Sequence, residues 1–345
     1  MMPQDSTAVE HEGRRGLARF FSSLSDIDTT FIEPQHYKFT VMAQTSALYD
    51  MMYLRFNDSR LRSVTLSSGV NIKLGPYFGY RWAFLGYNFD LFYSGLTASN
   101  KADKRWELSV YSSALFFDLI WRNTGNSYKI RHGYLADGTR LHGVSSEPFD
   151  ALKQTSKGVN AYYVFNHRRF SMPAAYSQST CQKVSSGSAI VGLGYFHDKS
   201  ELNYDKLDNF LDRHYPGLLG SDTLSGRDYI RSNTLNLFGG YGYNWVFADN
   251  WLFSACITAG VAFKHVKNSG DEETVHSHNF RNFTPDGTLR LGLVYNNMRW
   301  YWGSIFTLYS NNFHNSKFTS LNAFGQLSVY VGYNFAAFKK YRKKQ

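Results

Sequence analysis

Ten charged residues could carry chemistry because they fall within or beside strand-like segments and not in polar loops. Their registers alternate with apolar side chains, so all ten are expected to face the enclosed side of a sheet. The set is Lys38, Lys73, Arg81, Asp90, Glu107, Asp118, Arg122, Arg168, Lys264 and Arg290. Enclosed charges are costly unless they are paired or hydrated. The set therefore predicts either a structural ion-pair network or a narrow water path whose basic excess favours anions.

A hydrolytic site would need a nucleophile, a base and an orienting group within mutual reach. Serines are abundant, but no histidine stands beside one in a recognisable motif. The nearest strand-borne case is His197, which is followed by Asp198. These residues predict no catalytic centre.

Metal and cofactor sites have weak support. One loop combines acidic residues with histidines, Asp271, Glu272, Glu273, His276 and His278. It could bind a divalent cation, but a surface loop of this kind is usually only solvated. Cys181 and Cys256 lack the spacing of metal ligands, and a disulfide between them requires their strands to be close. No glycine pattern marks a phosphate site at a strand-to-helix turn. We therefore predict neither a metal nor another cofactor.

The elements that must position the charged residues are strands of period two, seen best in residues 231–264. One face of this segment carries Leu235, Leu237, Tyr241, Tyr243 and Trp245, and after residues 247–250 the alternation restarts at Trp251. The other face is small and polar. This pattern predicts a long antiparallel hairpin. Its strands exceed the ~5–6 residues that are usual in globular sheets.

The same alternation recurs along the chain and predicts twelve strands. They span about 37–49, 63–80, 87–93, two strands in 105–123, 156–167, 184–198, two in 231–264, two in 282–313, and 318–335. Short connections at 81–86, 113–114, 247–250 and 296–298 alternate with long ones at 55–62, 95–104, 124–155, 199–228, 267–280 and 313–317. Within 199–228, Leu207, Phe210 and Leu211 have helical spacing and predict a short helix at the mouth.

One connection on the short side, residues 168–183, is too long and too apolar for a simple turn. Its distinctive residues are Phe170, Met172, Pro173 and Tyr176. It could pack beneath the sheet as a turn, or it could fold into the lumen as a constriction.

Long strands with one apolar, aromatic-ended face and one small polar face are typical of a transmembrane antiparallel up-and-down β-barrel. Aromatic residues make up 17 % of the 345 residues, and no apolar run approaches the ~20 residues of a membrane-spanning helix. A soluble β-sandwich, the alternative, would have shorter strands. We expect short periplasmic turns, long extracellular loops and both termini in the periplasm of a bacterial outer membrane.

The ends of the chain are basic and set the expected domain bounds. The net charge is +10, with clusters near Arg14 and in residues 339–344. Such clusters favour anionic lipid headgroups over nucleic acid because no compact basic fold accompanies them. We predict an N-terminal periplasmic segment at 1–30 with a short amphipathic helix, a barrel at 31–337 and a basic tail at 338–345. The first thirty residues contain no signal-peptide h-region, so we take the chain as a mature form with an added start.

Several motifs are distinctive: Asp26-Ile27-Asp28-Thr29-Thr30-Phe31-Ile32-Glu33-Pro34, Tyr37 to Met42, Lys73 to Trp82 with Phe84 to Tyr87, Phe170-Ser171 with Pro173-Ala174-Ala175, and Gln182 with Ser185 to Ser188. In these motifs the chain resembles a Bacteroidetes outer-membrane β-barrel family known as domain of unknown function 4421. The resemblance spans about 26–335. It implies a barrel and a compartment, but no activity and no catalytic residue.

Together these features predict a barrel without catalytic activity, either a component of a larger outer-membrane complex or a narrow, anion-favouring, porin-like channel. The alternative is a lipid-modifying hydrolase, because some twelve-stranded outer-membrane barrels are lipid acyl hydrolases. Expected partners are outer-membrane lipids including lipopolysaccharide, the barrel-assembly machinery, and other outer-membrane proteins. The aromatic residues Tyr333 and Phe335 would form the terminal-strand signal that the assembly machinery reads.

Overall fold

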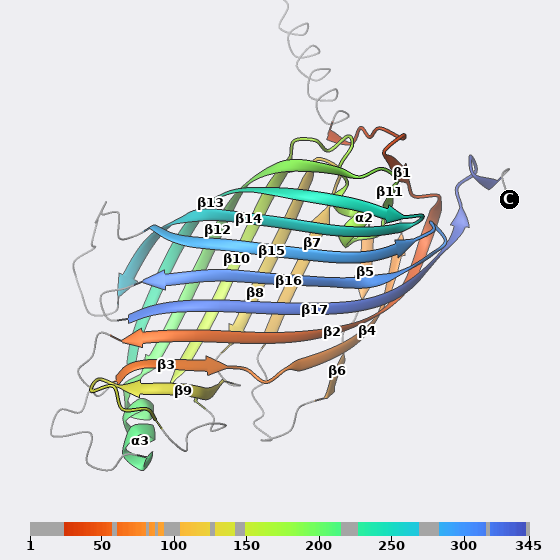
Figure 1. Ribbon diagram of the computed structural model, residues 1–345. Coiled ribbons are helices and arrows are strands. Elements are labelled where there is room, and N and C mark those ends of the chain that lie inside the picture. The colour runs from red at the N-terminus through yellow and green to blue at the C-terminus, as the bar shows by residue number, and fades with distance from the viewer. Residues whose placement is uncertain are drawn as a thin grey trace, which may run out of the picture.

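The computed structural model describes residues 24–56, 61–80, 83–86, 89–92, 104–124, 128–141, 149–214, 227–268, 283–314 and 318–342. These residues form a nearly all-β structure in which one long antiparallel sheet curls around an interior (Figure 1). Among them, no helix has the length and apolar character needed to cross a membrane.

Twelve strands follow one another around the described sheet in the order β5-β4-β2-β17-β16-β15-β14-β13-β12-β10-β8-β7. Their bounds are β2 (Tyr37–Phe56), β4 (Asn71–Tyr80), β5 (Ala83–Gly86), β7 (Lys104–Tyr111), β8 (Leu115–Thr124), β10 (Leu152–Val164), β12 (Ser186–Asn203), β13 (Arg227–Ala248), β14 (Trp251–Asn268), β15 (Phe283–Asn296), β16 (Trp300–His314) and β17 (Phe318–Ala337). A short strand, β6 (Phe89–Phe92), also pairs with β4, and β17 pairs with β2. Neighbours in this order pair antiparallel, and most of them also follow one another in the chain, so the predicted all-β, antiparallel up-and-down architecture is confirmed.

The hairpin predicted at residues 231–264 is present as β13 and β14, which have 22 and 18 residues. Its two faces differ as expected. Leu235, Tyr241 and Trp245 are exposed on the outside, whereas Asn236, Asn244 and Ser254 are buried inside. The period of two in the sequence therefore corresponds to the outer and inner faces of a curled sheet.

The sheet has two ends, named here for their connections. The turn end carries the short connections after β7, β13 and β15, together with residues 165–185 and the C-terminal strand end. The loop end carries the long connections, including β3 (Leu61–Ser67), β9 (Lys129–Leu135) and α3 (Tyr204–His214). The predicted helix in 199–228 is confirmed by α3.

Two predicted segments at the loop end are wrong. The single strand expected at 63–80 is divided into β3 and β4, and β3 pairs with β9 as well as with β2. The segment 124–155, expected to be a loop, contains β9 and the start of β10. A local apolar core explains both differences, because Leu66, Ile130 and Leu207 pack together there with residues of β2 and β10.

At the turn end, the turn expected at 81–86 is shorter, because β5 occupies residues 83–86 and pairs with β4. The strand expected at 156–167 runs from Leu152 to Val164. The helix predicted near residues 16–21 and the acidic, histidine-containing loop at 271–278 lie outside the described residues.

Candidate functional site

The apolar insert at 168–183 folds into the interior of the sheet at the turn end. Its centre is α2 (Met172–Tyr176), which begins at the N-cap Ser171, whose hydroxyl accepts a hydrogen bond from the Ala174 backbone N–H at 3.1 Å. All five residues of α2 are buried. The insert therefore packs among buried residues on the inward side of the sheet. We call residues 170–179 the plug.

The inward faces of β13, β14 and β15 provide the seat for the plug. The Tyr176 hydroxyl lies 3.1 Å from the Ser254 hydroxyl and donates to the Arg290 carbonyl at 3.2 Å. A Cβ added at Gly242 would lie 2.7 Å from the Phe170 ring, so only glycine leaves room for that ring. The small residues on the inward face, which the sequence pattern showed, therefore leave the space that the plug occupies.

Polar side chains fix the two ends of the plug. Asn244, which is fully buried, donates from Nδ2 to the Ser171 carbonyl at 2.9 Å and to Gln182 Oε1 at 3.1 Å. At the other end, Gln178 Nε2 donates to the Tyr330 hydroxyl at 2.6 Å. Because these partners belong to β13 and β17, the plug is bonded to walls on different parts of the sheet.

Residues 26–36, near the N-terminus, contact the chain on both sides of the plug, and we call this segment the strap. Its strand β1 (Ile32–Pro34) pairs with β11 (Thr180–Gln182), and Figure 1 shows both beside α2. Glu33 accepts from His36 at 2.8 Å and forms an ion pair with Lys183 at 3.3 Å. Ion pairs also join Asp26 to Arg168 at 2.6 Å and Asp28 to Arg169 at 3.6 Å. The strap thus ties the plug to the start of β2.

The strap should loosen in acid. Burial raises the pKa of Glu33, but the hydrogen bonds and charges of His36 and Lys183 outweigh it and leave the pKa below its ordinary value of 4.5. Hydrogen bonds from Thr30 lower the pKa of Asp28 below 3.8. Depressed carboxyl pKa values stabilise the folded form above the ordinary values, and that stabilisation is lost as the pH falls through the depressed values. We expect hydrogen exchange of residues 28–36 to be slow at pH 7 and to lose protection, relative to the intrinsic rate, below about pH 4.

The double variant Asp28→Asn with Glu33→Gln is the control for this pH effect. It should show weaker protection at pH 7 and little further loss on acidification. Equal wild-type protection at pH 7 and at pH 3 would contradict the assigned role of the two carboxylates.

Above the plug, an ion pair crosses the interior. Arg290 of β15 donates from Nη2 to Asp118 Oδ2, and each side chain is 1 % exposed. Asp118 Oδ1 also accepts from the Ser109 hydroxyl at 2.6 Å. The two residues lie on strands five ladder steps apart, from β15 through β14, β13, β12 and β10 to β8, so the pair spans the curled sheet from one wall to the other.

Aromatic rings surround the buried guanidinium. The Arg290 Cζ atom lies 5.4 Å from the ring centroid of Phe116, 5.6 Å from Tyr162 and 5.7 Å from Tyr309. Rings at this range favour a cation through their negative faces. Phe116 and Tyr162 are themselves stacked, with centroids 4.3 Å apart. A buried ion pair and its aromatic neighbours therefore cross the interior at this level.

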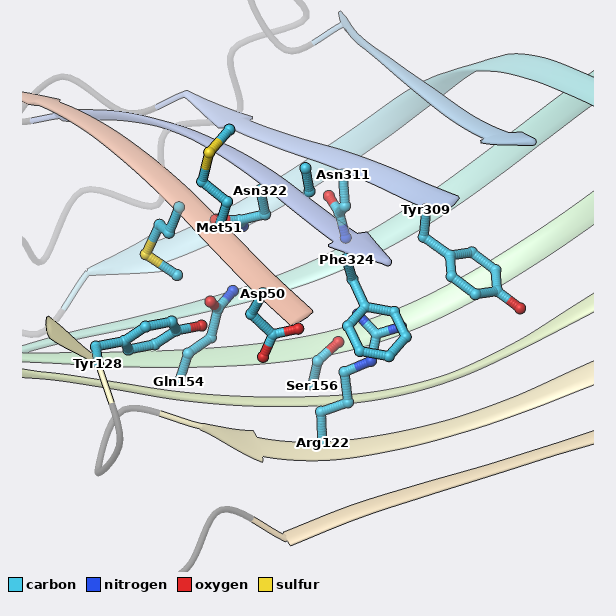
Figure 2. Close-up of a pocket in the computed structure, with 12 residues that line it drawn as sticks. Asp50, Met51, Arg122, Tyr128, Gln154, Ser156, Tyr309, Asn311, Asn322 and Phe324 are labelled. Atoms are coloured by element: carbon cyan, nitrogen blue, oxygen red, sulfur yellow. The ribbon is translucent and has the colours of Figure 1, made fainter. Parts of the chain in front are cut away.

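Nearer the loop end, a chamber of ≈ 60 Å³ remains between β2, β16 and β17 on one side and β8 and β10 on the other (Figure 2). The volume accommodates about two water molecules. It is lined by Asp50, Met51, Met52, Arg122, Tyr128, Gln154, Ser156, Tyr309, Asn311, Asn322, Ala323 and Phe324. The Arg122 guanidinium lies 3.9 Å from the Phe324 ring centroid, so a predicted lumenal charge forms part of the chamber wall.

The other predicted lumenal charges have different positions. Lys264 is buried and donates to Asn311 Oδ1 at 3.2 Å and to the Asn312 carbonyl. Lys73 lies opposite Asp90 in the ladder between β4 and β6, and Lys38 lies near the turn end of β2. Glu107 lies opposite Ile120 in the ladder between β7 and β8.

Two of the predicted charges do not join the interior. Arg168 is an exposed turn residue paired with Asp26, so its predicted lumenal position is wrong, because the alternation of β10 ends at Val164. Arg81 lies outside the described residues. The predicted terminal-strand residues Tyr333 and Phe335 lie near the turn end of β17, where Phe335 stacks on Phe39 and the Tyr333 hydroxyl accepts from Arg299.

The remaining chemical candidates are kept apart by the fold. His197 is exposed and contacts Asn233 at 2.8 Å, whereas Asp198 is buried on the opposite face of β12. The two cysteines are free, Cys256 buried on β14 and Cys181 on β11. Burial raises the pKa of the Cys181 thiol to about 11. Within the part of the chain that the structure describes, no group of three or more His, Cys, Asp or Glu residues is arranged to hold a metal ion.

One protein family matches most of the chain. The family described as "Domain of unknown function (DUF4421)" matches residues 26–335. The chain belongs to this family. The predicted resemblance is therefore confirmed. Of the residues that carried it, Asp28 and Glu33 belong to the strap of this DUF4421 member, Ser171 belongs to the plug, and Gln182 accepts a hydrogen bond from the Ser171 backbone N–H.

Solved structures similar to this DUF4421 chain are distant. The outer membrane protease OmpT from Escherichia coli has 6 % identity and a TM-score of 0.37, and the alignment covers 86 % of this chain and 97 % of OmpT. The beta domain of the Bordetella autotransporter BrkA has 11 % identity and a TM-score of 0.33, with 86 % and 100 % covered. The Pseudomonas putida toluene transporter TodX has 9 % identity and a TM-score of 0.23, with 87 % and 91 % covered. Because these identities and TM-scores are low, we infer no activity for the chain from them. No curated protein matches it.

Sequence reasoning did not identify the residues that seat and fix the plug. Asn244, Ser254, Gln178 and Tyr330 contact it from strands or positions far apart in the chain. A usable signal was present: the inward registers of β13 to β15 are unusually small at the turn end, where Gly242 and Gly292 approach the insert. Small inward residues opposite an apolar insert predict that the insert occupies the lumen.

Proposed function

We propose that this DUF4421 member is an integral outer-membrane β-barrel without catalytic activity that acts as a membrane-embedded component of a larger complex, and that its lumen is closed. The packing of side chains inside the sheet is the observation that carries the proposal. The plug packs into the turn end, and the Arg290–Asp118 pair with its aromatic neighbours crosses the interior above it. This arrangement favours the complex component over the open, anion-favouring channel.

Insertion into a membrane is supported by the outward face. Leu193, Leu237 and Ile257 are each more than half exposed, as are further apolar residues around β12 to β14. An apolar surface of this extent would be unfavourable in water and is the surface that lipid requires. At the turn end, the ring centroids of Trp251 and Trp302 lie 4.8 Å apart, and those of Trp300 and Tyr333 lie 4.6 Å apart. Such a group of rings is typical of the aromatic girdle at a membrane interface.

The orientation follows from the connections. Bacterial barrels place short turns in the periplasm and long loops outside the cell. The turn end, with the strap and the C-terminal end of β17, is therefore assigned to the periplasm. Tyr333 and Phe335 would then lie near the periplasmic interface, where the assembly machinery engages a terminal strand.

A vesicle experiment tests the closed lumen. The full chain is reconstituted into liposomes that contain a small fluorescent anion, and insertion is checked by the heat-dependent gel mobility of a folded barrel. We expect efflux no faster than from protein-free liposomes. Rapid efflux from liposomes with an inserted barrel would contradict the closed-lumen proposal.

A charge placed on the outward apolar face should destabilise the barrel according to depth. Leu193 lies midway along β12, so Leu193→Arg should cost about 2–4 kcal/mol of unfolding free energy in lipid vesicles. His197→Arg, four residues nearer the loop end on the same face, should cost about 0–1 kcal/mol. Denaturant titration of both variants measures the difference. Equal, small costs at the two positions would show that this face is not in lipid.

A further inference from the structure

The outward face of the sheet changes from apolar to basic between two neighbouring rows near the loop end. The ladders place Leu119, Val159, Tyr195, Leu235 and Phe263 side by side in one row. The next row toward the loop end contains Trp121, Lys157, His197, Asn233 and His265. One row further, Lys199 lies directly opposite Arg231. We call Lys157, His197, Lys199, Arg231 and His265 the basic face.

Two cations of the basic face are placed where they repel each other. Like charges directly opposite in an antiparallel pair are destabilising, and Lys199 and Arg231 have this arrangement. Within the described part of the chain, neither these two residues nor Lys157 forms an ion pair. Glu201, the acidic side chain nearby, lies opposite Lys153 in the ladder between β10 and β12. A bound anion would relieve this repulsion.

Aromatic rings support the ammonium groups at this boundary. Lys157 Nζ lies 5.8 Å from the Trp121 ring centroid, and Lys199 Nζ lies 5.0 Å from that of Tyr229. Such contacts hold a cation near an apolar surface while its charge stays available to a headgroup.

An apolar groove adjoins the basic face. It has a volume of ≈ 440 Å³ and is lined by Leu108, Leu119, Ile120, Trp121, Lys157 and Gly158. Lys157 and Trp121 belong both to the groove and to the first basic row. The groove therefore places an apolar ligand segment beside a cationic one, which is the chemistry of a lipid with an anionic headgroup.

We propose that the basic face and the adjoining groove bind lipid A, the phosphorylated glycolipid of lipopolysaccharide, with its phosphates on Lys157, Lys199 and Arg231 and an acyl chain in the groove. This inference rests on the proposed membrane orientation, in which the loop end faces the outer leaflet. The cations span β10 to β13, about 10 Å at the spacing of neighbouring strands. A headgroup with more than one phosphate matches that width and charge better than one with a single phosphate.

Native mass spectrometry of the full chain in neutral detergent tests the assignment. The protein is titrated with lipid A, with dephosphorylated lipid A, or with phosphatidylglycerol, and bound lipid is counted. We expect the wild type to prefer lipid A over both other lipids. The triple variant Lys157→Gln, Lys199→Gln, Arg231→Gln should bind lipid A at least about tenfold more weakly.

A matched control removes the same charge elsewhere at the loop end. Arg55→Gln, Arg62→Gln, Arg140→Gln changes three exposed arginines away from β10 to β13 and should bind lipid A as the wild type does. Undiminished binding by the first triple variant, equal loss in the control, or equal binding of phosphatidylglycerol would overturn the proposal. Heat-dependent gel mobility shows separately whether each variant is a folded barrel, and liposome efflux tests the closed lumen independently of lipid binding.

Discussion

Replacing residues 170–179 with a flexible Gly-Ser linker of equal length is expected to turn a silent barrel into a conducting one. The replacement removes Phe170, the α2 residues and Gln178 from the interior, together with their hydrogen bonds to β13, β14 and β17. Water can then enter from the turn end and pass beside the Arg290–Asp118 pair toward the loop end. Because basic side chains exceed acidic ones among the predicted inward charges, the new conductance should favour anions.

Planar bilayer recording measures this effect as discrete current steps that the wild type lacks. Tyr176→Phe is the matched control: it keeps the volume of the plug, loses only the hydroxyl contacts with Ser254 and Arg290, and should stay silent. If the linker variant does not fold, Met172→Ala with Tyr176→Ala opens the same space with fewer changes. A folded variant of either kind that remains silent would contradict the role of the plug as the closure.

Asp118→Ala should be the most destabilising single substitution in the interior. The Arg290 guanidinium would stay buried with no carboxylate, and removing one partner of a buried ion pair typically costs about 3–5 kcal/mol. The rings of Phe116 and Tyr162 would remain, but each cation–π contact contributes only about 0.5–2 kcal/mol. Denaturant unfolding in detergent micelles measures the loss.

The double variant Asp118→Leu with Arg290→Met is the control for this prediction. Replacing both charges with apolar side chains of similar volume leaves no buried charge without a partner, so its stability should lie close to that of the wild type. A cost for Asp118→Ala below about 1 kcal/mol, or a double variant less stable than the single one, would show that the pair is not desolvated as the structure places it.

The sequence predicted the strands well where alternation is long, and poorly where burial is local. In β13 and β14 one face meets the outside and the other the interior over the full length, so the period of two is continuous. In β9 it is interrupted, because the partner strand β3 pairs with register shifts and both pack into a separate apolar core. That core depends on α3 and on residues of β2 and β10, which no local pattern identifies.

The interior was predicted only in part, for a similar reason. The alternation along the strands placed Asp118 and Arg290 on the inward face. Their contact, however, joins residues 172 positions apart in the chain on opposite walls of the sheet. The alternation gave the wrong position for Arg168 because β10 ends four residues earlier, at Val164. The insert could be read in two ways because its position depends on Gly242 and Asn244, which belong to other strands.

The most direct test of the closed, membrane-embedded barrel is planar bilayer recording of the wild-type full chain after its insertion has been verified by protease protection of the reconstituted protein. We predict no current steps at either polarity. Stable, anion-selective steps from the wild type would contradict the closed interior and would favour the channel.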